Sequence, residues 1–211
     1  APIVAEKFGF HHRVQWLLTF SLPFMILGVI LSTLHQSSFG SLYLIVPNRL
    51  HALWYTPLLP VLFFVSCLAS GLSMVIIQTL VLSRHRPAIL SPKLLGHLGK
   101  LIAVILALYL VVRLQDMYTR GAFRGLEPFG YHSLAFYSEI LVGFVAPLVL
   151  LMSDRIRHSR RGLYAACLMV LAGFAANRMN TAVTGLERWP AQTYVPSIPE
   201  VLITLGIAAV G

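Results

Sequence analysis

Long apolar runs separated by short polar stretches dominate the pattern along the chain. Several runs lack the polar face that a helix keeps at the surface of a soluble protein, and they reach the roughly 20 residues needed to cross a bilayer. Backbone polar groups in lipid must be satisfied within their own segment, so such runs fold as helices. The pattern predicts five complete spanning helices and a shorter sixth, at about residues 14–35, 58–82, 98–119, 133–153, 162–186 and 197–211.

The connection between the first two predicted helices, residues 37–57, has an unusual pattern. It is too apolar for an exposed loop and too broken by glycine, serine and proline for a helix. Trp54 and Tyr55 are of the residue types that favour the headgroup level. We expect a re-entrant or interfacial segment that covers one end of the bundle. Farther along, Pro147 predicts a kink in the fourth helix.

Composition supports a membrane protein. Hydrophobic residues make up 57% of the 211 residues and charged residues only 11%, whereas a soluble domain is about a quarter charged. The predicted fold class is therefore all-α, a polytopic transmembrane helix bundle in which residues 1–211 form a single transmembrane region. Because the last apolar run is shorter than a full span and the sequence has no initiator Met, we expect the chain to be cut at its C-terminus and at its N-terminus.

The formal charge of +9 fits basic loops that set topology and touch anionic lipid better than it fits nucleic-acid binding. By the positive-inside rule, an excess of lysine and arginine marks the cytoplasmic side. We therefore expect a multi-pass protein of the bacterial inner membrane with the first residues of this chain in the cytoplasm. Nine basic residues lie on the predicted cytoplasmic side and four on the other side. The nine are Lys7, Arg13, Arg84, Arg86, Lys93, Arg155, Arg157, Arg160 and Arg161, and the four are Arg49, Arg120, Arg124 and Arg188.

Metal and haem sites find little support in the sequence. Cys67 and Cys167 lie inside apolar runs without a CxxC spacing, so no iron–sulfur or zinc site is expected. A bis-histidine haem needs two imidazoles at matched depth. His35, His132 and His51 share one end of the bundle but lie at the membrane edge. We expect no haem or iron–sulfur cluster in this chain.

Ionisable residues at one depth form the candidate site. At 1.5 Å per residue, Arg113 and Arg178 lie roughly 22 and 24 Å from the cytoplasmic helix ends, and Glu139 lies about 9 Å from the outer end. Such residues are costly inside a membrane and often mark functional sites. The alternative is structural pairing, Arg113 with Asp116 and Arg178 with Glu139 across helices. The candidate quinone or proton-path residues are His35, Gln36, Arg113, Asp116, Glu139 and Arg178.

Four segments carry a resemblance to a known family. Residues 31–45 (LSTLHQSSFGSLYLI), 50–60 (LHALWYTPLLP), 174–186 (FAANRMNTAVTGL) and 193–206 (TYVPSIPEVLITLG) resemble the NrfD/PsrC family, which includes the polysulfide reductase membrane subunit. The resemblance is greatest to its HybB-like branch, the "cytochrome b" subunit of periplasmic nickel–iron hydrogenase. It implies eight to ten helices with a repeated four-helix bundle, of which this chain supplies the later part.

The resemblance also implies a function. It implies a periplasmic ferredoxin-like iron–sulfur subunit and a catalytic subunit, a nickel–iron hydrogenase or a molybdenum reductase, as partners. It further implies electron exchange with menaquinone or ubiquinone near the outer face. We hypothesise that His35 contacts the quinone or the partner, that Asp116 and Glu139 carry protons, and that Arg113 and Arg178 keep these carboxylates ionised and in position.

Two alternatives stay open beside this hypothesis. The chain could be a structural anchor without its own quinone chemistry, or a redox-coupled proton-translocating subunit as in alternative complex III. A secondary transporter is disfavoured, because its site should lie near the membrane midplane and the polar layer here is displaced outward.

Overall fold

The structure of the protein is a computed structural model that describes residues 11–45, 49–83, 92–126, 130–186, 197–200, 202, 203 and 206. For residues 11–19, 22 and 125 it describes the backbone alone. The described residues are helical or in short connections, and their one β-bridge is an isolated pair between Leu50 and Leu186.

Five helices in the described part of the chain are long and apolar enough to cross a membrane, which confirms the predicted fold class. The first three are α2 (His11–Leu44), of which Pro23–Leu44 is the apolar part, α3 (Leu59–Leu82) and α4 (Pro92–Thr119). The fourth consists of α5 (Tyr131–Ser138), η4 (Glu139–Val145) and α6 (Ala146–Met152), and the fifth of α8 (Arg160–Met179) and η5 (Asn180–Thr184). Two short helices, η3 (Ala122–Gly125) and α7 (Asp154–Arg157), lie in connections.

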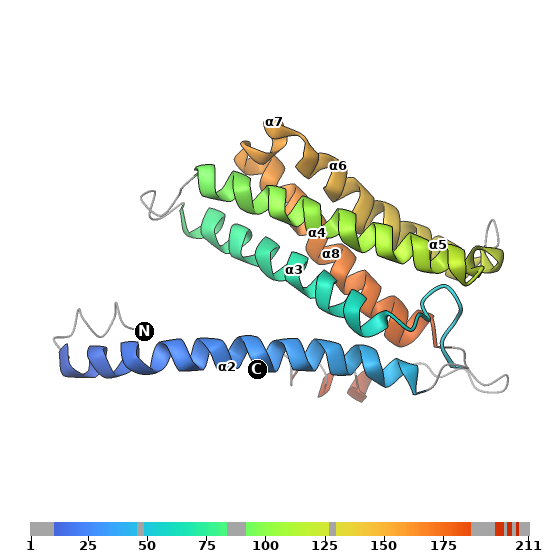
Figure 1. The fold of residues 1–211 in the computed structure, drawn as a ribbon, viewed down its shortest axis with the longest axis horizontal. Coiled ribbons are helices and arrows are strands. Elements are labelled where there is room, and N and C mark those ends of the chain that lie inside the picture. The colour runs from blue at the N-terminus through green and yellow to red at the C-terminus, as the bar shows by residue number, and fades with distance from the viewer. Residues whose placement is uncertain are drawn as a thin grey trace.

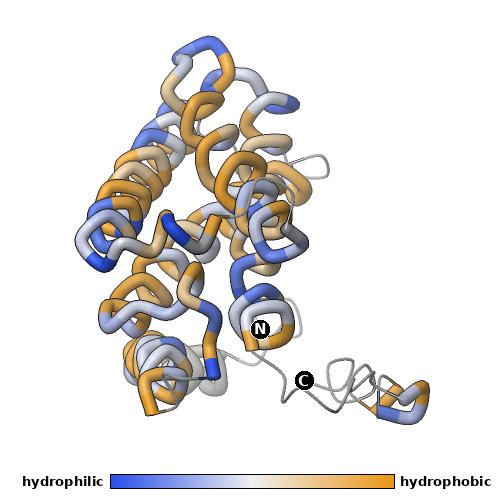
Figure 2. The backbone as a smooth tube through the Cα atoms, turned by 90° about the vertical axis from the view of Figure 1, so that its right-hand side faces the viewer, coloured by the Kyte–Doolittle hydropathy of each residue, from blue (hydrophilic) through white to orange (hydrophobic). Residues whose placement is uncertain are grey.

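The last four spans run alongside one another as a bundle, while α2 is set apart and meets α3 near its own C-terminal end (Figure 1). Hydrophobic stretches run along the spanning helices (Figure 2). Large apolar side chains stay exposed on the outside, among them Phe24 at 67% and Val104 at 59%. A soluble protein rarely exposes contiguous apolar surface of this extent, so these faces suit lipid.

The first helix continues nine residues beyond its predicted end, so the expected broken segment at residues 37–44 is wrong. The hydroxyl of Ser41 donates a hydrogen bond to the carbonyl oxygen of Ser37, which satisfies the serine inside the helix. Gly40 lets α2 approach α3 closely, because a Cβ there would lie 2.6 Å from the Cα of Pro60. Packing against α3 thus overrides the weak local helix propensity.

Residues 50–58, here named the covering segment, do fold over one end of the bundle as predicted. Leu53, Trp54 and Thr56 in this segment are fully buried. The backbone N–H of His51 donates to the carbonyl oxygen of Gly185, which ties the segment to the end of the fifth span. The covering segment is therefore part of the packed core, and it brings Trp54 beside the fourth span.

A seven-residue π-helical segment, η4, precedes Pro147 in the fourth span. Proline has no backbone N–H to donate within the helix, and a local change of helix type accommodates that loss. A second π-helical segment, η5, begins at Asn180 in the fifth span. π-Helical turns are frequent at functional sites, and here their first residues, Glu139 and Asn180, are bonded to each other.

Candidate functional site

A buried carboxylate stands at the centre of the site. Glu139 is 1% exposed, and it accepts hydrogen bonds from the indole Nε1–H of Trp54 at 3.0 Å, the Nδ2–H of Asn177 at 2.7 Å and the Nδ2–H of Asn180 at 2.8 Å. The three donors come from the covering segment, α8 and η5. A buried acid is tolerated when its oxygens are hydrogen-bonded in this way. The site therefore depends on three separate segments being folded together.

Asn177 links this carboxylate to a partly buried cation, Arg178. Its Oδ1 accepts a hydrogen bond from Nη1 of Arg178 at 2.7 Å, while its Nδ2–H donates to Glu139. The sequence raised a direct pair between Arg178 and Glu139 as the structural alternative. Arg178 instead bonds the amide of Asn177, while the carboxylates of Asp116 and Asp154 pair with Arg120 and Arg157. The amide of Asn177 therefore lies between the carboxylate of Glu139 and the guanidinium of Arg178.

Arg178 joins three helices. Its Nη2 donates to the carbonyl oxygen of Phe63 at 3.0 Å, to Oγ of Ser66 at 3.1 Å and to Oε1 of Gln36 at 3.3 Å. The guanidinium carbon lies 3.5 Å from the ring centre of Phe63 and 4.5 Å from that of Phe174. Stacking and hydrogen bonding of this kind suit arginine and not lysine. Gln36 of α2 and Arg178 of α8, two of the candidate site residues, are thereby brought together.

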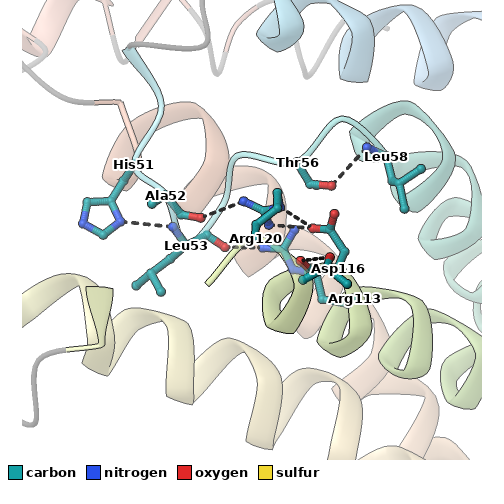
Figure 3. A network of polar contacts seen from close by, with 9 residues as sticks. His51, Ala52, Leu53, Thr56, Leu58, Arg113, Asp116 and Arg120 are labelled. Atoms are coloured by element: carbon teal, nitrogen blue, oxygen red, sulfur yellow. Dashed lines mark hydrogen bonds and ion pairs between the residues drawn. The ribbon is translucent and has the colours of Figure 1, made fainter. Parts of the chain in front are cut away.

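Arg113 and Asp116 hold the covering segment (Figure 3). Nη2 of Arg113 donates to the carbonyl oxygen of Leu53 at 2.7 Å, and Arg113 is 1% exposed. Asp116 pairs with Arg120 at 2.6 Å, and Arg120 also donates to the carbonyl oxygen of Ala52 at 3.5 Å. The predicted pairing of Arg113 with Asp116 is therefore wrong. Both arginines instead bond carbonyl oxygens of the segment.

Five of the six predicted site residues thus lie at one end of the bundle and are connected by hydrogen bonds, directly or through the covering segment. His35 is exposed on α2, next to Gln36, and its ring lies 6.0 Å from that of Phe39. Whether these residues bind a ligand stays a prediction. The five connected residues are Gln36 on α2, Arg113 and Asp116 on α4, Glu139 at the start of η4 and Arg178 on α8.

Sequence reasoning missed the partners of Glu139. It assigned Trp54 to the headgroup level and did not include Asn177 or Asn180 among the candidate site residues. The available signal was spacing, since residues three apart on a helix share a face, so both asparagine amides project to the same neighbour. Nothing in the sequence indicated that Trp54 is fully buried.

Two histidines lie beside Trp54. The rings of His51 and His132 are stacked with their centres 4.6 Å apart and their planes 19° apart, and the ring of His132 makes an edge contact with Trp54. Nδ1 of His132 is buried without a hydrogen-bond partner among the described residues. The ring faces of the two histidines point at each other, which differs from the arrangement of two axial haem ligands. Over the described residues, no cluster of three or more His, Cys, Asp or Glu side chains could hold a metal ion.

Replacing Trp54 with phenylalanine is expected to lower the free energy of unfolding by about 1–3 kcal/mol, because it removes one donor from the buried carboxylate of Glu139 and keeps most of the ring volume. Tyr137→Phe is the matched control, since Tyr137 is 38% exposed and its hydroxyl makes no hydrogen bond among the described residues. Denaturant unfolding in detergent checks both variants. Equal stability of the two would mean that the indole N–H contributes nothing.

Comparison with known proteins adds a family to this geometry. The sequence profile described as polysulphide reductase, NrfD, matches residues 1–187. A protein of Nitratidesulfovibrio vulgaris (Hildenborough) is 33% identical over 98% of this chain and 55% of its own length. The probable Ni/Fe-hydrogenase 2 b-type cytochrome subunit of Escherichia coli K12 is 29% identical over 100% of this chain and 54% of its own length.

A more distant relative is named for a different enzyme. This protein of Halobacterium salinarum, a putative membrane subunit of dimethyl sulfoxide reductase, is 22% identical over 75% of this chain and 43% of its own length. The chain thus spans about half the length of the curated relatives it matches. No solved structure gives a significant match.

Proposed function

We infer a redox function for this chain, which belongs to the polysulphide reductase (NrfD) family. We propose that it is part of a membrane subunit that exchanges electrons between an iron–sulfur subunit outside the membrane and the quinone pool. The names of two relatives, a hydrogenase b-type cytochrome subunit and a reductase membrane subunit, support a redox complex with a separate catalytic subunit. The hydrogenase relative matches the whole chain, so a nickel–iron hydrogenase is the partner we favour.

The observation that carries the proposal is the buried Glu139–Asn177–Arg178 chain of hydrogen bonds. Ionisable side chains within a membrane are costly, and they commonly serve ion, proton or ligand paths. The hydrogen bonds continue from Arg178 to Gln36 on α2, the helix set apart from the bundle. The polar groups therefore reach from the core of the bundle to a lipid-facing helix, where a lipid-soluble substrate has access.

Side chains around Arg178 fit a quinone ring. The guanidinium is only partly buried, but its Nε is itself buried and has no hydrogen-bond partner among the described residues, so this N–H can serve a carbonyl oxygen once the side chains around it move aside. Of the two rings against the guanidinium, Phe63 is 1% exposed and Phe174 is partly exposed, so Phe174 is the one that offers aromatic surface to a quinone ring. We propose that Gln36 and Arg178 bind menaquinone or ubiquinone, with His35 at the exposed edge of the site.

Reduction of a quinone to a quinol takes up two electrons and two protons. The electrons come from the iron–sulfur subunit. Glu139 is the carboxyl group nearest to Arg178 in the hydrogen-bonded chain, and we propose that it takes up the two protons in turn and passes each to the bound quinone. Asp116 is 9% exposed and lies under the covering segment, where it exchanges protons with the outer solution. Arg113 is a positioning residue, because it fixes Leu53 and hence the adjacent Trp54 beside Glu139.

Replacing Arg178 with lysine tests the binding role. Lysine keeps the positive charge but cannot bond Gln36 and Asn177 as a planar fork. We expect KM for a quinone analogue to rise about 10-fold to 100-fold, the loss that accompanies one or two hydrogen bonds to a charged group, with a smaller change in kcat. The assay is quinone reduction by the full-length complex in proteoliposomes.

Arg124→Lys is the matched control, since Arg124 is exposed in η3 at the same end of the bundle. Reduction of a soluble artificial acceptor by the catalytic subunit reports on assembly. An unchanged KM for quinone in Arg178→Lys would favour a structural anchor whose quinone chemistry lies elsewhere.

A further inference from the structure

A basic cavity lies between the end of α3 and the start of α8. It has a volume of about 300 Å³ and is lined by Leu80, Val81, Arg160, Arg161 and Tyr164. A smaller cavity of about 110 Å³ shares Leu80 and Arg160 with it and extends toward Arg157 and His158. Arginine and apolar side chains thus line one connected region of the surface.

This cavity is at the opposite end of the bundle from the site around Glu139. Arg160 and Arg178 are both on α8, and at 1.5 Å per residue they are about 27 Å apart along the helix axis. The apolar core of a bilayer is about 30 Å thick. Figure 1 shows α7 and the start of α8 at the end of the bundle away from the covering segment. When Arg178 is just inside one membrane surface, the cavity lies at the headgroup level of the other.

The two arginines of the larger cavity carry unneutralised charge. Both Arg160 and Arg161 are exposed, and neither has a hydrogen bond or an ion pair within the described ranges. Arg157 differs, because it is paired with Asp154 and donates to the carbonyl oxygen of Leu151 at 2.7 Å. The arginines also occupy the first turn of α8, where the helix dipole and free backbone N–H groups favour an anion.

We propose that this cavity binds the phosphate group of an anionic phospholipid. Arg160 and Arg161 bond the phosphate oxygens, because guanidinium groups match phosphate geometry. The remaining lining is apolar or aromatic, and Leu168, which is exposed on α8 one turn beyond Tyr164 on the same face, lies farther toward the membrane interior. That surface takes an acyl chain, which a free phosphate ion does not have. Basic pockets between transmembrane helices are a known form of lipid-headgroup site.

The test measures binding of a defined lipid to the full-length protein in detergent by native mass spectrometry. The probes are dioleoyl phosphatidylglycerol, dioleoyl phosphatidylcholine and inorganic phosphate. We expect phosphatidylglycerol to bind more tightly than phosphatidylcholine. Arg160→Gln with Arg161→Gln is expected to weaken phosphatidylglycerol binding about 30-fold, since each basic residue contributes roughly fivefold.

The control variant, Lys93→Gln with Arg155→Gln, removes the same charge from exposed residues that line neither cavity. It is expected to keep the affinity of the unchanged protein. Equal weakening in the two double variants would overturn the proposal in favour of diffuse surface charge. Binding of phosphatidylcholine as tight as that of phosphatidylglycerol, or full competition by inorganic phosphate, would overturn it as well.

A third variant keeps the proposal testable if the double glutamine variant does not fold. Arg160→Lys with Arg161→Lys keeps the charge, and it is expected to retain the preference for phosphatidylglycerol over phosphatidylcholine. Loss of that preference in this folded variant would contradict an electrostatic phosphate site. The proposal is independent of the quinone function, because the substituted residues lie at the other end of the bundle from Glu139. The measurement is also of lipid binding and not of quinone reduction.

Discussion

Glutamine in place of Glu139 is expected to slow quinone reduction about a hundredfold to ten-thousandfold, the range that proton transfer by a positioned side chain contributes. Glutamine has nearly the same volume but cannot give up or take up a proton. If Glu139 supplies a proton to the bound quinone, the variant lacks the nearest carboxyl group in the hydrogen-bonded chain. The expected result is a fall in kcat that exceeds any change in KM.

The same variant tests how strictly the site is arranged. One oxygen of Glu139 accepts from Trp54 and Asn180, and the other accepts from Asn177. A glutamine amide has one acceptor oxygen, so in either orientation its NH₂ group faces a donor. At least one buried hydrogen bond is therefore lost, the one from Asn177 in the better orientation, at a cost of about 1–3 kcal/mol in the free energy of unfolding. That loss alone leaves the bundle folded.

Quinone reduction by the complete complex in proteoliposomes measures this effect, with the amount of assembled complex determined on native gels. Asp154→Asn is the matched control, because it removes a carboxylate that is paired with Arg157 at the opposite end of the bundle. A full rate of quinone reduction in the Glu139 variant, with the quinone still binding, would rule out this carboxyl as the proton donor.

Alanine in place of Gly173 is expected to lower the free energy of unfolding by about 3 kcal/mol, the upper part of the usual range for overpacking. A Cβ at Gly173 would overlap the Cα and carbonyl of Gly143 on η4, and a Cβ at Gly143 would overlap the Cα of Gly173. The obstructing atoms are backbone atoms, which cannot rotate away. Small residues allow this close crossing of membrane helices.

The crossing also sets the geometry of the site. Gly143 follows Glu139 by four residues, and Gly173 precedes Asn177 by four, so the carboxyl and the amide lie about one turn from the point of closest approach. Separating the two helices at the glycines therefore lengthens the hydrogen bond between Glu139 and Asn177. We expect the Gly173 variant to lose quinone reduction along with stability.

Gly71→Ala is the matched control for this substitution. Gly71 is an exposed residue of α3, and a Cβ there meets nothing within 4 Å. Alanine is favoured over glycine in a helix by up to about 1 kcal/mol, so the control is expected to be neutral or stabilising. Thermal unfolding in detergent compares the two variants. A Gly173 variant as stable as the Gly71 variant would show that the helices do not cross in contact at this point.

Sequence patterns alone determined the spanning helices and the depth of the polar residues. Apolar length is a local property, because each helix satisfies its own backbone hydrogen bonds in lipid, and the five predicted spans are therefore present. The axial position of a residue follows from its place along a helix. Glu139 and Arg178 were accordingly assigned to one layer, and they share one hydrogen-bonded network through Asn177.

Only the tertiary structure decided which of these side chains meet. Depth along a helix does not specify how the helix is rotated or what packs against it. By spacing, Asp116 could pair with Arg113 or with Arg120. It pairs with Arg120, because the guanidinium of Arg113 donates to the carbonyl oxygen of Leu53. Likewise, Asn177 separates Arg178 from Glu139 because the glycine crossing brings α8 against η4.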